Sequence, residues 1–122
     1  MIDYQGSKWK KKRKKILRRD GYEDKVAKYF GRAIDANTVH HIYPVDEYPE
    51  YQWCDWNLIS VSKETHNKLE NRKTGELTKL GRWLMQITRI PEEYKKIPPY
   101  LRYEKFKKIY WDRVGSSKSK QF

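Results

Sequence analysis

The first regular pattern of apolar positions lies in the segment KWKKKRKKILRR, residues 8–19. Its stripe recurs near helical spacing and consists of Trp9, Arg13, Ile16 and Leu17. This spacing predicts a helix with one narrow apolar face and a broad basic one. Residues 1–7 show no comparable pattern, so we expect them to form a flexible leader, with Ser7 available to cap the helix.

Two short stretches of β-branched and aromatic residues flank an acidic, aromatic segment in the middle of the chain. TVHHIY (residues 38–43) and NLISVS (residues 57–62) each favour a strand, and the segment between them is expected to form a long loop. A helix-like stretch follows, from about Lys63 to Arg72. Strand, loop, strand and helix in this order predict a ββα unit over about residues 38–72.

The C-terminal part has a second helical pattern. Beyond Gly75, a stripe at helical spacing predicts a helix that packs on the rest, and it consists of Leu77, Leu80, Leu84 and Ile87. We expect a helical extension over residues 91–114, with its last helix from about Tyr100, and a disordered tail over residues 115–122. The predicted fold is α+β and mainly helical, with one domain over residues 8–90 and helices flanking the ββα core.

The net charge of the chain indicates which kinds of partner it can bind. The 122 residues include 28 Lys and Arg against 16 Asp and Glu, for a formal net charge of +12. Such an excess favours phosphate polymers or anionic surfaces. No apolar run approaches the roughly 18 residues that span a bilayer, and no signal peptide is visible. The single Cys54 cannot form an internal disulfide. We therefore expect a cytoplasmic protein that has no membrane partner. Nucleic acid is the favoured partner.

The basic residues form a concentrated candidate contact surface for DNA. Nine of the twelve residues in 8–19 are basic, and blocks of like charge need a compensating partner. A solvated arm or a localisation signal is the alternative. The predicted DNA contacts, mainly to phosphates, are made by Lys8, Lys10, Lys11, Lys12, Arg13, Lys14, Lys15, Arg18, Arg19, Lys68, Arg72 and Lys73.

The three histidines are the candidates for chemistry. In a strand, the adjacent His40 and His41 point to opposite faces, so they cannot easily bind one ion together. His66 and Glu70 stand four apart in the predicted helix and share a face. A ββα unit would bring that face to the strands, which makes His40, His66 and Glu70 a candidate metal set. His41 remains free as a base.

Hydrolysis of a phosphodiester suits this arrangement. A neutral His41 with the ordinary histidine pKa of about 6.5 can take a proton from water at physiological pH. One divalent cation can polarise the phosphate and stabilise the leaving oxygen. Asn57, at the start of the second strand, can hydrogen-bond across the loop and fix the strand that carries His41. The alternative for Asn57 is an ordinary turn residue.

The pattern VHHIYP, then WNLISV, then THNKLENRKTGEL resembles the HNH endonuclease family, and most closely its small phage and prophage members. The resemblance covers roughly residues 8–82. It implies the ββα-metal fold, with His40 as the first metal ligand and His41 as the general base. It further implies that Asn57 orients the His41 loop and that His66 is the second ligand.

Two departures from the family pattern affect the metal. The Cys-x-x-Cys pairs of many relatives are absent, so no structural zinc is expected. Glu70 stands where many relatives have a further histidine. As a ligand, this harder donor would favour Mg²⁺ or Mn²⁺ over Ni²⁺ or Zn²⁺. Alternatively, Glu70 pairs with Arg72 or Lys73 and water completes the site.

Three functions follow. The first is a metal-dependent DNA endonuclease that nicks or cuts duplex DNA with low sequence specificity, in phage DNA packaging, homing or restriction. The second is a nucleic-acid-binding module that has kept the fold and lost the chemistry. The third is an accessory protein, activated by docking on a phage terminase or another larger machine. The site residues favour the first.

Overall fold

The structure is a computed structural model, and it describes residues 2–95 of the chain. The α-helices and strands in this part are α1 (Ser7–Arg19), α2 (Lys25–Tyr29), β1 (Thr38–His41), β2 (Leu58–Val61), α3 (Lys63–Leu69), α4 (Lys79–Ile87) and α5 (Glu92–Lys95). The segment between the strands, predicted as a long loop, contains two short 3₁₀ helices, η1 (Pro49–Tyr51) and η2 (Asp55–Asn57). The helix expected from Tyr100 and the tail over 115–122 lie outside the described residues. None of the described helices has the length and apolar character needed to cross a membrane.

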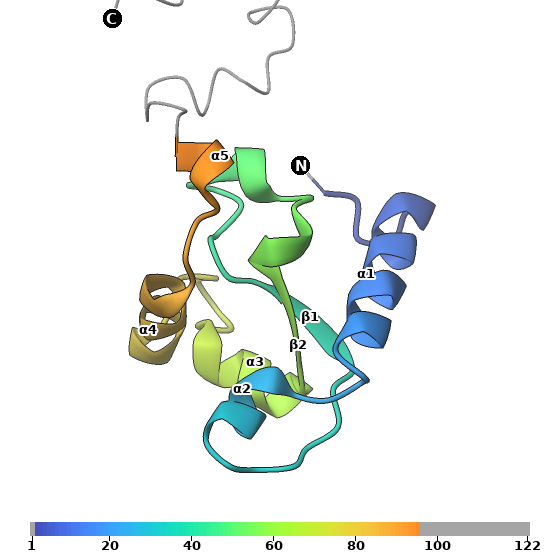
Figure 1. Cartoon of the computed structure of the whole chain (residues 1–122), viewed down its shortest axis with the longest axis vertical. Coiled ribbons are helices and arrows are strands. Elements are labelled where there is room, and N and C mark those ends of the chain that lie inside the picture. The colour runs from blue at the N-terminus through green and yellow to red at the C-terminus, as the bar shows by residue number, and fades with distance from the viewer. Residues whose placement is uncertain (1, 96–122) are drawn as a thin grey trace, which may run out of the picture.

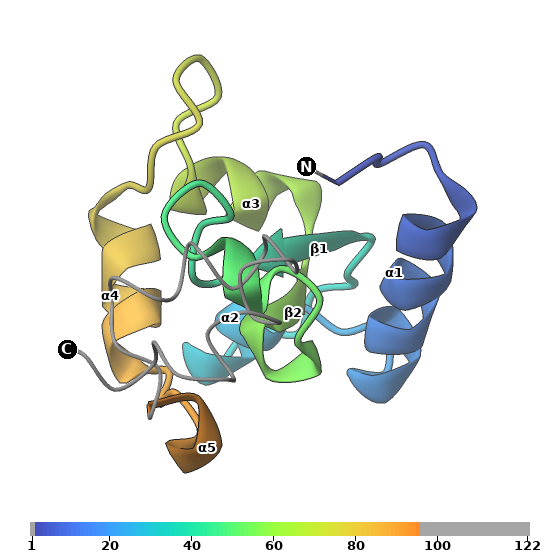
Figure 2. The ribbon, with the colours of Figure 1, turned by 90° about the horizontal axis from the view of Figure 1, so that it is seen from above.

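Strands β1 and β2 form an antiparallel pair, with His40 opposite Ile59 and His41 opposite Leu58. Helix α3 follows β2 directly, which gives the predicted ββα order. Helix α1 lies on one side of the strands, whereas α3 and α4 lie on the other (Figures 1 and 2). The fold is therefore α+β. The description "mainly helical" holds only roughly, because long loops connect the elements of the described part.

Apolar side chains divide into two clusters around the strand pair. The cluster beneath α1 consists of Ile2, Trp9, Ile16, Leu17, Ala36, Val39 and Leu58. The cluster on the side of α3 and α4 consists of Val26, Ile42, Tyr43, Tyr51, Val61, Leu69 and Leu84. Trp53 packs on the first cluster and Trp56 on the second. Both tryptophans thus contribute to packing, as an aromatic-rich core of this size requires.

The start of the chain differs from the predicted flexible leader. Ile2 is 5% exposed and belongs to the cluster beneath α1. The backbone N–H of Gly6 donates to the carbonyl of Asp3, and Gly6 rather than Ser7 is the N-cap of α1. A single anchoring residue leaves no periodic signal, so the sequence pattern could not identify it.

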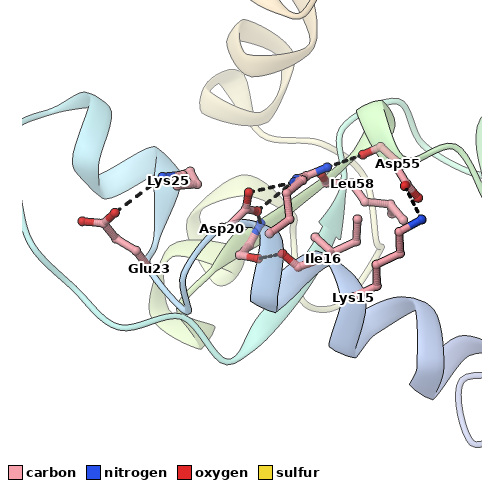
Figure 3. A network of polar contacts seen from close by, with 9 residues as sticks. Lys15, Ile16, Asp20, Glu23, Lys25, Asp55 and Leu58 are labelled. Carbon is pink, nitrogen blue, oxygen red and sulfur yellow. Dashed lines mark hydrogen bonds and ion pairs between the residues drawn. The ribbon is translucent and has the colours of Figure 1, made fainter.

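Two aspartates hold the outer edge of β2. The N–H groups of Ser60 and Ser62 point away from β1, and they donate to Asp20 and Asp24 at 3.0 and 2.9 Å. Figure 3 shows Asp20 in its network of polar contacts. Asp24 also caps α2, because it accepts from the N–H of Ala27. Burial opposes the charge of Asp20 and Asp24, but these hydrogen bonds, together with those from Arg19 to Asp20, outweigh it and lower the pKa of both carboxyls. The strand edge is thereby closed to further pairing.

Helix α3 ends at Leu69, earlier than the predicted Arg72. Glu70 is extended and forms a bridge with Leu77, while the side chain of Asn71 accepts from the N–H groups of Lys73 and Thr74. This local hydrogen bonding competes with a further helical turn. The resulting loop between α3 and α4 projects away from the body of the molecule (Figure 2).

Helix α4 confirms most of the second apolar stripe. Leu84 is buried and Leu80 packs on the same cluster, but Ile87 is 48% exposed. Thr78 begins the helix, because its hydroxyl accepts from the N–H of Gly81. The prediction that Ile87 packs on the rest is therefore wrong, since the covered face of α4 ends one turn earlier.

Candidate metal centre and active site

The alternation of side chains along β1 separates the two adjacent histidines. His40 points toward α3, where its ring centroid lies 5.2 Å from that of His66. His41 points toward α1, where it stacks on Trp9 with ring centroids 5.4 Å apart and planes 21° from parallel. His40 is fully buried, and His41 is 8% exposed. Neighbours in sequence therefore occupy two different environments.

His40, His66 and Glu70 bring three potential ligand atoms together. Glu70 Oε2 lies 3.3 Å from His40 Nδ1 and 3.4 Å from His66 Nε2. One ligand atom from each of the three residues lies within 4.8 Å of the other two. Ligands bound at about 2.1 Å to one tetrahedral or octahedral ion are about 3.0 to 3.4 Å apart. The two measured separations match that range. The residues present thus fit one divalent ion.

The hydrogen bonding and protonation of these groups also favour a bound cation. Neither ring nitrogen of His40 makes a hydrogen bond within the described part of the chain, and burial lowers the pKa of this histidine. Burial opposes the charge of Glu70, but the adjacent His40 and His66 rings outweigh it and lower its pKa to about 2. A buried imidazole whose polar contact is a charged carboxylate 3.3 Å away is, together with that carboxylate, a set of donors that a metal would satisfy.

Glu70 reaches the histidines by a route that differs from the prediction. It lies just beyond α3 rather than on the helix, and its bridge to Leu77 fixes its backbone. No ion pair joins Glu70 to Arg72 or Lys73 among the described residues. This geometry is consistent with Glu70 as a ligand, which stays a prediction.

His41 is held in one orientation. Its Nε2 lies 3.0 Å from the carbonyl oxygen of Gln52, which can only accept, so Nε2 carries the proton and Nδ1 has the free lone pair. Burial lowers the pKa of His41 to about 4, below the ordinary value that the sequence analysis assumed. The imidazole is therefore neutral at pH 7. A phosphate anion beside it would raise this pKa again.

Asn57 connects the end of β1 to the loop before β2. Its Oδ1 accepts from the N–H of Tyr43 at 2.7 Å, and its Nδ2 donates to the carbonyls of Tyr43 and Tyr51, both at 3.1 Å. The side chain is fully buried. These bonds fix the backbone two residues after His41. Orientation of the His41 loop, the role predicted for Asn57, is consistent with this geometry and stays a prediction.

The predicted DNA contacts of α1 divide into two groups. Lys12 and Lys15 form ion pairs with Asp55 at 2.6 and 2.9 Å, as Figure 3 shows for Lys15. Arg19 binds Asp20 and donates to the carbonyls of Asp55 and Leu58. These three hold α1 to the rest of the molecule. The predicted contacts that are exposed and form no ion pair among the described residues are Lys8, Lys10, Lys11, Lys14, Arg18, Lys68, Arg72 and Lys73.

A hollow of about 530 Å³ connects the metal set with His41 and α1. Its lining adds Tyr4, Trp9 and Arg13 to His41, His66 and Glu70. The sequence predicted Trp9 in the apolar stripe of the helix and Arg13 among the DNA contacts, but it placed neither residue beside the metal set. It missed Tyr4 and the carbonyl of Gln52, because neither belongs to a periodic pattern or a motif.

Comparisons with known proteins bear on the fold. No protein-family model and no curated protein matches the chain. Among solved structures, the chain is similar to the crystal structure of an HNH endonuclease from the deep-sea thermophilic bacteriophage GVE2, with manganese ion. The two share 25% identity and a TM-score of 0.50, over 52% of this chain and 70% of that one. The resemblance predicted from the sequence is thus confirmed at the level of the fold: this chain has the HNH-like ββα architecture of the HNH endonucleases.

Proposed function

We propose that this protein is a metal-dependent DNA endonuclease that hydrolyses phosphodiester bonds. The observation that carries the proposal is the set of His40, His66 and Glu70 on one face of β1, with neutral His41 on the other. An HNH endonuclease as structural neighbour supports it. Both groups line or adjoin the same hollow, so one bound phosphate can meet both.

His41 would act as the general base. With Nε2–H held by the carbonyl of Gln52, its Nδ1 lone pair is available to accept a proton from a water molecule near the phosphate. Trp9 stacks on the ring and restricts its rotation. Asn57 would keep the backbone after β1 in place, so that the ring stays at the same depth in the hollow.

His40, His66 and Glu70 would hold one divalent ion. When bound there, this ion would polarise the phosphate and stabilise charge on the leaving oxygen. A carboxylate among the donors favours Mg²⁺ or Mn²⁺, although two imidazoles also suit Ni²⁺ or Zn²⁺. The manganese ion of the structural neighbour is consistent with this preference.

DNA binding would rest mainly on phosphate contacts. The exposed cations of α1, together with Lys68, Arg72 and Lys73, would contact the phosphate backbone of DNA. Such contacts position a protein on DNA but do not read the base sequence. We therefore infer low sequence specificity and binding that weakens steeply with salt. Phage DNA packaging, homing and restriction are all biological settings that such an enzyme could serve.

A nuclease that needs a partner for full activity is the second candidate. The observation that favours it is the burial of His41, whose pKa of about 4 makes it a weaker base than an exposed histidine. A phage terminase or another larger machine that rearranges the α1 side would expose the ring. This candidate predicts slow cleavage by the isolated chain and a rise when the partner is added.

Cleavage of supercoiled plasmid by the purified chain tests the proposal. We expect nicking with Mg²⁺ or Mn²⁺, none with EDTA, and none with His41→Ala, while the variant still binds DNA. Ni²⁺ and Zn²⁺ are run in parallel to define the preferred ion. Absence of cleavage with every metal, or equal cleavage by His41→Ala, would contradict the proposal and leave a binding module.

A further inference from the structure

The hollow at the candidate active site continues along one side of α1. A second hollow of about 450 Å³ shares Tyr4, Trp9 and Arg13 with the first. Its remaining lining includes Lys10, Lys14 and Tyr22. The two together form a groove that begins at His66 and Glu70 and follows α1 toward its C-terminal end. We call it the α1 groove.

The cations of the α1 groove are available to a ligand. Lys10 and Lys14 are exposed and stand four apart, so they lie on one face of the helix. Arg13 is partly exposed and donates to the carbonyl of Asn37, and it pairs with no carboxylate among residues 2–95. Lys12 and Lys15, in contrast, are already paired with Asp55. The groove that leads from the metal set therefore has three cations that form no ion pair within the described part, and the same holds for Lys8 and Lys11 on the other side of the helix.

The α1 groove also contains aromatic rings with accessible surface. Tyr4 is 50% exposed, and its ring meets the buried Trp9 edge-on, with centroids 5.2 Å apart at 84°. Tyr22 at the far part of the groove is 46% exposed. Ile2 is buried, which anchors the segment that carries Tyr4. The first ring is thus held at the mouth of the candidate site rather than carried on a loose leader.

We propose that the α1 groove binds a single-stranded segment of DNA that leaves the duplex beside the scissile phosphate. This inference rests on the proposed endonuclease function and specifies its substrate. Lys10, Arg13 and Lys14 would contact phosphates, while Tyr4 would stack on a base. A base inside a duplex is covered on both faces by its neighbours, so only an unpaired base can use this ring. The preferred substrate is therefore forked, flapped or otherwise locally unpaired DNA.

The opposite side of α1 is less suited to this role. A hollow there is lined by Lys8, Lys11 and Trp53 together with the paired Lys12 and Lys15, and its lining includes none of the metal-set residues. The Lys8 ammonium lies 4.2 Å from the centroid of the Trp53 ring and covers it. This side offers charge without an open ring next to the chemistry. It supplies a matched control surface on the same helix.

Fluorescence anisotropy with the full chain in EDTA tests the proposal without cleavage. The probes are a labelled single-stranded oligonucleotide, a blunt duplex and a forked duplex of the same sequence. We expect the fork to bind more tightly than the blunt duplex. Tyr4→Ala should weaken fork and single-strand binding by about 5- to 150-fold, with little change for the duplex, and Tyr4→Phe should restore it. Tyr29→Ala, on a ring 66% exposed at α2, is the matched control.

A second pair of variants covers the case in which Tyr4→Ala fails to fold. Lys10→Ala with Lys14→Ala should weaken fork binding more than Lys8→Ala with Lys11→Ala, although each pair removes two charges from the same helix. Equal binding of fork and duplex, or equal losses in the two pairs, would overturn the proposal. The plasmid assay then reports separately on the nuclease function, since duplex cleavage can persist without the groove.

Discussion

The two faces of β1 carry the same residue type in opposite settings. On the face toward α3, the buried His40 meets His66 and Glu70, and its nitrogens make no hydrogen bond in the described part of the chain. On the face toward α1, His41 is stacked on Trp9 and fixed through Nε2 by the carbonyl of Gln52. Under the proposed function, His40 would bind a metal ion and His41 would accept a proton. The alternation of side chains along the strand would thus give two neighbouring histidines two separate roles.

The largest effect is expected on the His41 face. His41→Ala removes the proposed base and should reduce the single-turnover cleavage rate by about 10²- to 10⁴-fold, the range of general base catalysis. Gel analysis of plasmid nicking at saturating protein measures it. His66→Ala serves as the comparison, because it should reduce cleavage to a similar extent through loss of the metal instead. A His41→Ala cleavage rate within a few fold of the wild-type rate would contradict the role of His41 as the general base.

Asn57→Ala should produce the next largest effect, on folding. It leaves the N–H and carbonyl of Tyr43 without their buried partner and removes the link to the loop at Tyr51. We expect the free energy of unfolding to fall by about 2 to 4 kcal/mol, measured by urea denaturation. Asn67→Ala, on α3 and partly exposed, is the control and should change it by less than about 0.5 kcal/mol. Equal losses in the two variants would contradict the role of Asn57.

Glu70→Gln tests the other face. The substitution keeps the size of the side chain but removes the charge that lies 3.3 and 3.4 Å from the two histidines. Mn²⁺ affinity should fall by at least about 10- to 100-fold, the loss typical when a group that supports a metal ligand is removed. Calorimetry measures this affinity. Glu76→Gln, exposed in the same projecting loop, should leave affinity unchanged. Unchanged affinity in Glu70→Gln would instead favour water at this position.

The smallest effect is expected on stability, from the ion pairs that hold α1 over the His41 face of β1. Lys12 and Lys15 are paired with Asp55, so Lys12→Met should lower the free energy of unfolding by up to about 1 kcal/mol, and less at high salt. Lys14→Met should leave stability unchanged and weaken DNA binding instead. Thermal denaturation and anisotropy separate the two outcomes. Identical profiles for both variants would mean that the division of basic residues has no functional meaning.

The sequence predicted the ββα order because β-branched and aromatic runs of the right length bracket a loop and precede a helical stretch. It also predicted that His40 and His41 diverge, since strand alternation is a local rule. Asn57 and His66 were identifiable from their spacing in the motif. These features depend on short-range patterns that a single sequence contains.

Other features depend on contacts between distant segments. The anchoring of Ile2, and with it the position of Tyr4, requires the finished cluster beneath α1. The pairing of Lys12 and Lys15 with Asp55 could not be separated from the general basicity of residues 8–19 without the packing of α1 on the strands. The early end of α3 followed from side-chain hydrogen bonds of Asn71, which compete with the helix.

The most direct test of the account is a Mn²⁺ titration, by calorimetry, of the wild-type chain, His40→Ala and His41→Ala. The account predicts one ion per wild-type chain, loss of that binding in His40→Ala, and nearly unchanged binding in His41→Ala. Such a result would separate the two faces of β1 without reliance on activity. Binding that survives in His40→Ala, or that disappears in His41→Ala, would contradict the assignment of the metal to one face and the base to the other.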